Sequence, residues 1–95
     1  MNKSELIEAL AQELDMTTRQ STSILDTLLE TMMVAMELGD DIEIRGFGSF
    51  TVKEYKPYVG RNPKTGKQIA VRPKKLPFFK VGKELKGRVN SSISE

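Results

Sequence analysis

The residues with the clearest chemical potential form a basic turn in the second half of the chain. The heptapeptide GRNPKTG at residues 60–66 combines turn-forming proline, asparagine and glycine with positive charge, and Lys67 follows it. On either side, residues 51–56 and 68–72 contain the β-branched and aromatic side chains typical of strands. This pattern predicts the tip of a β-hairpin that buries little of its own surface. A basic ribbon ending in an exposed proline is suited to gripping a polyanion, and duplex DNA has the right dimensions.

Charge is divided unequally along the chain. The net charge is only +2, but residues 1–52 carry 3 basic and 10 acidic side chains, whereas residues 53–95 carry 12 basic and 3 acidic ones. Such asymmetry is typical of proteins that contact nucleic acids or membranes. A solvated basic face is the ordinary explanation for a small basic protein. Here the basic residues share one strand-turn-strand element and avoid the N-terminal helices, which favours a nucleic-acid ligand.

The composition argues against several other classes of protein. The 95 residues include no cysteine and no histidine, so the chain lacks disulfides, thiolate metal ligands and the usual general base. The nearest carboxylate cluster, Asp40-Asp41 with Glu54, is interpreted as turn and surface residues. We therefore expect no enzyme activity, cofactor, metal or small-molecule substrate. No run approaches the ~20 apolar residues that span a membrane, and the polar N-terminus is unlike a signal peptide. The sequence predicts a cytoplasmic protein without membrane contact.

Two capping boxes predict that the N-terminal half is helical. Asn2 with Glu5 is expected to cap the first helix, and Thr17 with Gln20 a longer second helix that reaches about residue 38 and is closed by Gly39. The apolar stripe of the second helix is wider than one short partner helix can cover. Part of it is ordinary core, and we expect the rest to pack against a second subunit, by default in a C₂ dimer. The predicted dimer core comprises Leu6, Leu10, Ile24, Leu25, Leu28, Leu29, Met32, Met36, Ile44, Phe47, Phe50 and Phe79.

Alternating polar and apolar residues predict strands after the helices. A hairpin turning at GFG, residues 46–48, is expected to place Ile42, Ile44, Phe50 and Val52 against the helices. A final helix is expected to be anchored by Leu85 and Val89. The sequence thus predicts one α+β domain over residues 1–95, with a helical dimerisation part (1–39), core strands (40–52 and 76–81), a β-ribbon arm (53–75), a C-terminal helix (82–90) and a flexible tail (91–95).

Several motifs together resemble one known family. The segments NKSELI at 2–7, GFGSF at 46–50, GRNPKTG at 60–66 and FKVGKEL at 79–85 occur at the spacing seen in the HU and integration host factor proteins. The similarity spans roughly residues 1–90. It is somewhat closer to the beta chain of integration host factor, through IEIRGFGSF at 42–50. The resemblance implies an intertwined dimer whose two β-ribbon arms follow the minor groove and bend DNA in the bacterial nucleoid.

The resemblance also implies roles for individual residues. Pro63 is the expected wedge between base pairs, and Arg61 and Asn62 are expected in the groove beside it. Phosphate contacts are expected from Lys64, Lys67 and Arg72 on the arm and from Lys3, Lys83 and Lys86 on the body, with Arg45 entering the minor groove. The full set of predicted DNA-binding residues is Lys3, Arg45, Lys53, Lys56, Arg61, Asn62, Pro63, Lys64, Lys67, Arg72, Lys74, Lys75, Lys80, Lys83 and Lys86. The resemblance leaves open whether the dimer contains two identical chains or two related ones.

The arm departs from the family pattern, and two other functions are compatible with its residues. Tyr55 and Tyr58 stand where arms of the family often carry arginine. Val59 replaces a common lysine, and Val81 replaces a frequent proline. Pro57 predicts a bulge or an edge position in the arm. One alternative is a single-stranded DNA or RNA binder that stacks bases on the two tyrosines, which requires aromatic residues alternating on one exposed face. The other is an interaction module whose arm adds a strand to a partner's sheet. That alternative does not explain the 12 basic residues after position 52.

Overall fold

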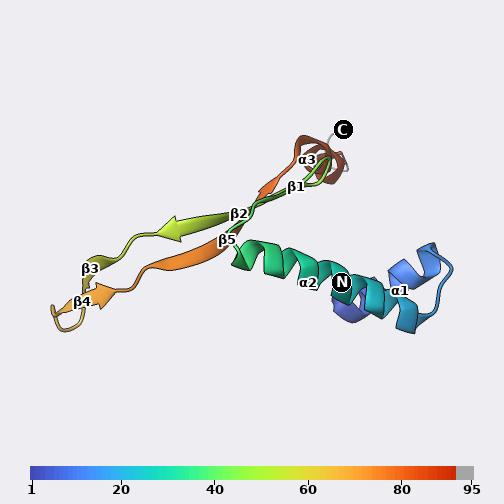
Figure 1. Ribbon diagram of the computed structural model, residues 1–95. Helices are drawn as coiled ribbons and strands as arrows, with labels where there is room; N and C mark the ends of the chain where they lie inside the picture. The colour runs from blue at the N-terminus through green and yellow to red at the C-terminus, as the bar shows by residue number, and fades with distance from the viewer. Residues whose placement is uncertain (92–95) are drawn as a thin grey trace.

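The chain is extended, with a helical part and a sheet that continues into a long arm (Figure 1). The computed structural model describes residues 1–91. Its radius of gyration is 19.4 Å and its extents are 58 × 40 × 27 Å. A compact domain of this length has a radius of gyration of about 12 Å. The single chain therefore does not close around a core of its own.

The helical part consists of α1 (Lys3–Glu13) and α2 (Thr18–Glu37). Both predicted capping boxes are confirmed. The Asn2 side chain accepts a hydrogen bond from the Glu5 N–H at 2.9 Å, and the Glu5 carboxylate accepts one from the Asn2 N–H at 3.0 Å. Thr17 and Gln20 make the equivalent pair at 3.1 and 3.0 Å. These side chains satisfy amide groups that the first turn of a helix leaves unpaired, so they fix where each helix begins.

The end of α2 follows from its glycine. Gly39 has φ +85°, which a residue without Cβ adopts at little cost. The N–H groups of Gly39 and Asp40 donate to the carbonyls of Met36 and Ala35, both at 3.0 Å. This is the Schellman arrangement, and it confirms that the second helix closes at Gly39. The chain is thereby turned away from the helix axis toward the first strand.

Little of the apolar surface is buried between α1 and α2. Among the described residues, the buried hydrophobic side chains are Ala11 and Leu25, at 7% and 5% exposure. Ser21 is fully buried, and its hydroxyl donates to the Ile7 carbonyl at 2.7 Å, which ties the two helices together. By contrast, Leu28 remains 53% exposed on α2. The two helices therefore cover only part of the apolar stripe.

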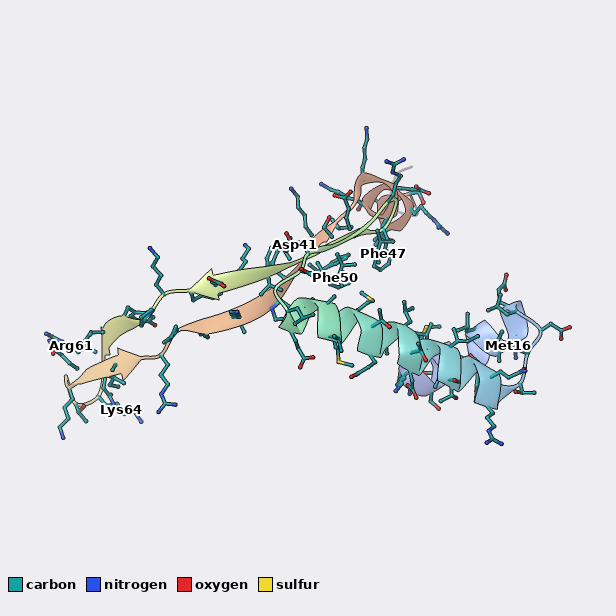
Figure 2. The ribbon with its side chains drawn as sticks, viewed as in Figure 1. Met16, Asp41, Phe47, Phe50, Arg61 and Lys64 are labelled. Atoms are coloured by element: carbon teal, nitrogen blue, oxygen red, sulfur yellow. The ribbon has the colours of Figure 1, made fainter. Side chains whose placement is uncertain are left out.

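The main sheet is antiparallel, in the order β1 (Ile42–Ile44), β2 (Gly48–Tyr55), β5 (Lys74–Val81). On one of its faces Phe50 lies opposite Phe79, with ring centroids 4.8 Å apart, and Phe47 adds a third ring at 5.5 Å from Phe79. Phe47 and Phe50 project to the side of the sheet on which α2 lies (Figure 2). Met33 and Met36 of α2 line a common cavity with Val52 and other residues of this face. Of the four residues expected against the helices, Ile44 is the most exposed, at 39%.

The arm is a second antiparallel pair, β3 (Tyr58–Arg61) with β4 (Gln68–Val71). The ladder is interrupted at residues 56–57 on one strand and 72–73 on the other, and each interruption ends in a proline, which has no N–H to donate. Pro57 thus lies in a break of the ladder. The main sheet extends three residues further along β2 and two further along β5 than the predicted boundaries of 52 and 76. The β2–β5 ladder therefore continues past position 52, where the basic part of the sequence begins, and ends only next to the prolines.

The chain ends in α3 (Lys83–Asn90). The Gly82 N–H donates to the Phe47 carbonyl at 2.9 Å, so the start of α3 is attached to the turn between β1 and β2. Leu85 is half-buried, as expected for an anchor. Val89, predicted as a second anchor, is 62% exposed in the single chain. Beyond Ser91, the predicted flexible tail lies outside the described residues.

A substitution at Gly48 tests how tightly the sheet closes around the β1–β2 turn. A Cβ at this position would lie 2.6 Å from the Lys80 carbonyl oxygen and 2.7 Å from the Phe79 ring. We expect Gly48→Ala to lower the free energy of unfolding by roughly 1–3 kcal/mol, because backbone must move to admit the methyl group. Gly87→Ala in α3 is the matched control, since nothing lies within 4 Å of its Cβ position and alanine favours helix. Equal melting temperatures for the two variants would contradict this account.

Candidate nucleic-acid interface

Apart from Lys3, the predicted DNA-binding residues lie in three places. Arg61 and Lys64 mark the tip of the arm, at the opposite end of the molecule from Met16 in the α1–α2 turn (Figure 2). A second group lies along β2 and β5, and a third where the β1–β2 turn meets α3. Lys3 is separate, on the helical part, where its Nζ pairs with the Asp26 carboxylate at 2.7 Å. Lys3 thus lies apart from the three basic groups and is already paired with an acidic residue of α2.

The arm tip is held in one conformation by its own hydrogen bonds. The Asn62 N–H donates to the Lys67 carbonyl at 2.8 Å, and the Gly66 N–H to the Asn62 carbonyl at 2.7 Å. The Asn62 side chain accepts from the Lys64 N–H at 2.8 Å, an Asx turn around Pro63, and Gly66 supplies the positive φ of +73°. Pro63 itself is exposed. The ring is therefore presented at the end of a preformed turn, and Asn62 builds that turn.

Register decides which face of the β2–β5 ladder each basic residue occupies. Residues directly opposite in an antiparallel pair share a face, and the faces alternate along the strand. Tyr55 lies opposite Lys74, and Lys53 opposite Leu76, on the face away from Phe50 and Phe79. We call this the outer face; it also carries Phe78 and Lys80. Lys75 belongs to the other face, where its Nζ lies 3.7 Å from the Glu54 carboxylate. The structure therefore separates Lys75 from the other predicted lysines of β5.

The third group lies where α3 begins. Gly82 is the N-cap and provides no side-chain cap, and Lys83 and Lys86 follow in the first turns of the helix. A helix N-terminus presents N–H groups that favour an anion, and a lysine there adds full charge. Gly46, next to Arg45, is close to α3, because a Cβ on it would meet the Glu84 carboxylate at 2.8 Å. The fold thus brings Arg45 and Lys83 to the same end of the sheet from positions 38 residues apart.

Phe78 belongs to the outer face, and the sequence did not single it out. The side chain is 47% exposed, and the Lys53 Nζ lies 3.8 Å from its ring centroid. The sequence predicts a core strand around Phe78 and Phe79. Strand alternation places two consecutive residues on opposite faces, so only one of the two rings can join the aromatic cluster. That alternation was the available signal for Phe78.

Asp40 and Asp41, interpreted from the sequence as turn residues, take part in hydrogen bonds that shape the backbone. The Asp41 side chain accepts from the Val52 N–H at 3.4 Å, and the Asp40 N–H takes part in closing α2. Over residues 1–91, no group of three or more Asp, Glu, His or Cys side chains could hold a metal ion. None of the helices in this part of the chain is both long and apolar enough to cross a bilayer.

An α+β chain with a long basic two-stranded arm and an uncovered helical part has the architecture of a DNA-binding protein. Residues 1–90 match the family model described as bacterial DNA-binding protein, and the chain belongs to this family. It is 48% identical over 94 residues to integration host factor subunit beta of Vibrio atlanticus, covering 98% of this chain and 100% of the relative. The same subunit of Colwellia psychrerythraea is 46% identical over 95 residues, covering 99% and 100%.

Solved structures show the same fold. An Anabaena HU–DNA cocrystal structure matches with a TM-score of 0.82 and 38% identity, covering 94% of this chain and 97% of that one. HU from Thermotoga maritima matches with a TM-score of 0.68 and 35% identity, covering 94% and 98%. The resemblance to the HU and integration host factor family and the α+β fold class are thus confirmed. Membership places the chain among DNA-binding architectural proteins, a family that is not enzymatic.

Proposed function

We propose that this protein binds duplex DNA through the minor groove as a dimer and bends it by inserting Pro63 between base pairs. The observation that carries the proposal is the exposed Pro63 ring on a turn fixed by the hydrogen bonds of Asn62 and Gly66. The HU relative that was crystallised with DNA shares the fold over 94% of this chain. In the cell, such a protein would organise the nucleoid and help to assemble protein–DNA complexes.

Proline is well suited to act as a wedge. Its ring is rigid and apolar and has no N–H, so it can replace a stacked base without burying an unpaired donor. Unstacking one base step costs a few kcal/mol. Phosphate contacts that only a bent duplex can reach offset this cost. Because the tip is already ordered by hydrogen bonds, little additional conformational entropy is lost when it enters the groove.

The basic residues provide the remaining contacts. Arg61, Lys64 and Lys67 flank the wedge, and Lys56 and Arg72 lie at the two breaks in the ladder. At the body, Lys83 and Lys86 lie beside the amide groups that start α3, and Arg45 lies at the same end of the sheet. Duplex DNA that bends around the body would meet this third group after leaving the arm. Lys3 would join it by exchanging the Asp26 carboxylate for a phosphate.

The proposed assembly is a dimer of this chain with itself or with a related chain. Seven of the twelve predicted dimer-core residues are at least 38% exposed in the single chain, namely Leu6, Ile24, Leu28, Leu29, Ile44, Phe47 and Phe79. Leaving so much apolar surface in water is unfavourable. The single chain is extended, and α2 and the sheet diverge from each other (Figure 1), so the exposed apolar residues of both are available to the helices and sheet of a second chain.

Salt dependence of duplex binding tests the proposed function. Each phosphate that the protein neutralises releases condensed counterions, so log K is expected to fall with log salt by about 0.9 per phosphate. We expect Lys83→Ala to weaken binding to all duplex sequences and to make this slope shallower by about 1 per lysine removed. Arg19→Ala is the matched control, because Arg19 is an exposed cation on α2 outside the three groups.

Fluorescence anisotropy with a labelled duplex, titrated at several salt concentrations, supplies both slopes. If affinity does not change with salt, counterion release does not drive binding and the proposed function fails. If Arg19→Ala makes the salt slope as shallow as Lys83→Ala does, the slope depends only on the total charge of the chain, and the basic residues at the start of α3 are not a contact site.

A further inference from the structure

The side-chain amide of Asn62 is only half engaged in the arm tip. Its Oδ1 accepts a hydrogen bond from the Lys64 N–H at 2.8 Å. Its Nδ2 donates no hydrogen bond within residues 1–91. The side chain is half-buried, whereas its neighbours Arg61 and Pro63 are exposed. The tip therefore carries an unused hydrogen-bond donor directly beside the proposed wedge.

The bond to Lys64 also decides which way the amide faces. A backbone N–H can donate only to the oxygen, so Oδ1 faces into the turn and Nδ2 faces away from it. Turning the amide by half a rotation would set two donors against each other and leave the Lys64 N–H unpaired. The Asn62 backbone is held as well, through the Lys67 carbonyl at 2.8 Å and the Gly66 N–H at 2.7 Å. The free part of this side chain is thus a donor in a fixed orientation.

The two kinds of base pair present different groups to such a donor in the minor groove. A·T and T·A pairs present only acceptors there, adenine N3 and thymine O2, whereas a G·C pair adds the N2 amino donor of guanine. A donor from the protein can bond to the acceptors of an A·T pair. It opposes the guanine amino group, because neither of the two groups can accept a hydrogen bond from the other. A protein acceptor in the same place would have the opposite preference.

We propose that the Asn62 Nδ2 donor selects A·T base pairs next to the point where Pro63 enters the groove. This inference rests on the proposed function and deepens it, because it states which base pairs the wedge favours. Asn62 is then a specificity-determining residue, since its acceptor is used inside the turn and only its donor can meet the DNA. Lys64 and Lys67 attract phosphates at every sequence, so they add affinity without this selectivity.

Selectivity for A·T pairs can also come from the DNA itself, because sequences differ in the energy needed to kink them. The variant Asn62→Asp separates the two causes. Aspartate keeps an oxygen for the Lys64 N–H, so the Asx turn is retained. It replaces the Nδ2 donor with a second acceptor of nearly the same size. The energy of kinking a given duplex is the same for both proteins, so a change in selectivity reports the protein group that meets the base pair.

The test uses two duplexes of about 35 base pairs that differ only in the minor groove. Each carries a nick as the entry point of the wedge, flanked either by G·C pairs or by inosine·C pairs. Inosine is guanosine without the N2 amino group. Fluorescence anisotropy gives the affinity of the full chain for each duplex, and energy transfer between the duplex ends gives the bend. Low salt keeps binding by the weaker variant measurable, because phosphate contacts are strongest there.

The ratio of the two affinities is the informative quantity. We expect the wild type to bind the inosine duplex roughly fivefold more tightly than the G·C duplex, within the range for one hydrogen bond. We expect Asn62→Asp to bind both duplexes more weakly because of its charge, and to bring the ratio to about one or below. Thr65→Ala is the control for a disturbed tip, since it removes the hydroxyl that accepts from the Lys67 N–H but keeps Asn62. It should retain the wild-type ratio.

The outcomes separate this inference from the proposed function. If the wild type and Asn62→Asp give the same ratio to within about twofold, deformability of the DNA sets the preference and the inference is wrong. Equal affinity of the wild type for the two duplexes also overturns it. If Thr65→Ala loses the ratio as Asn62→Asp does, selectivity depends on the shape of the tip and the Asn62 donor is not its source. A wild type that bends neither duplex removes the proposed function itself.

Discussion

Leu28→Asp is expected to abolish the dimer and, with it, the folded state and duplex binding. Leu28 is 53% exposed on α2 in the single chain, although it lies within the apolar stripe. If a second chain covers it, the substitution removes the ~2–5 kcal/mol that a buried leucine contributes. It also buries a carboxylate without a partner, which costs several kcal/mol more. Against a typical total stability of ~5–15 kcal/mol, this loss is large enough to unfold the protein.

Thr27→Asp is the matched control for this substitution. It introduces the same charge one residue away, on the polar side of α2 where Thr27, Glu30 and Thr31 line one shallow depression. We expect Thr27→Asp to remain a folded dimer. Light scattering gives the mass, circular dichroism gives the fold, and the dependence of the melting temperature on protein concentration reports association. A wild-type chain with monomeric mass and concentration-independent unfolding would contradict the dimer, as would a folded Leu28→Asp variant that still binds DNA.

Pro63→Ala is expected to leave binding largely intact while removing most of the bend. The hydrogen bonds that shape the tip come from Asn62, Gly66 and their partners, and none involves the Pro63 nitrogen, so the turn should survive. What disappears is the ring that replaces a stacked base. We also expect the wild type to prefer nicked, gapped or pre-kinked duplexes, in which unstacking already costs little, and the variant to lack this preference.

Energy transfer between the ends of a duplex of about 35 base pairs measures the bend directly, with each protein at saturation. Thr65→Ala is the matched control. It disturbs the tip by removing the hydroxyl that accepts from the Lys67 N–H at 3.3 Å but keeps the proline ring. We expect Thr65→Ala to shorten the end-to-end distance as the wild type does. If Pro63→Ala shortens it equally, Pro63 is only a turn residue and the arm binds the groove without kinking it.

Local signals in the sequence predicted the elements well because their causes are local. The capping boxes at Asn2 and Thr17, and the closure at Gly39, depend on residues a few positions apart, and the structure confirms each. The arm tip was also predictable, since its turn depends on hydrogen bonds within the short segment 62–67. The family motifs then predicted how these elements are arranged in the fold.

Features that depend on register or on distant partners were not predictable in the same way. The outer face exists because Tyr55 pairs with Lys74 and not with a neighbour, and a shift of one residue would reverse the faces. Ser21 reads as an ordinary polar helix residue until α1 brings the Ile7 carbonyl to it. The pairing of Lys75 with Glu54, which separates this lysine from the outer face, likewise follows from cross-strand register.

The two proline-ended interruptions provide a hinge between the β2–β5 sheet and the arm formed by β3 and β4. If the arm were rigid, strain from a kinked duplex would pass to the body of the protein, and a misaligned tip would distort the dimer. With the ladder open at residues 56–57 and 72–73, the β3–β4 segment can reorient while the β2–β5 sheet keeps its register. If the arm binds the minor groove as proposed, its tip would then be able to follow grooves of different width and path. The overall angle of the DNA would be set by the wedge and by the contacts at α3, and the arm itself would carry little mechanical load.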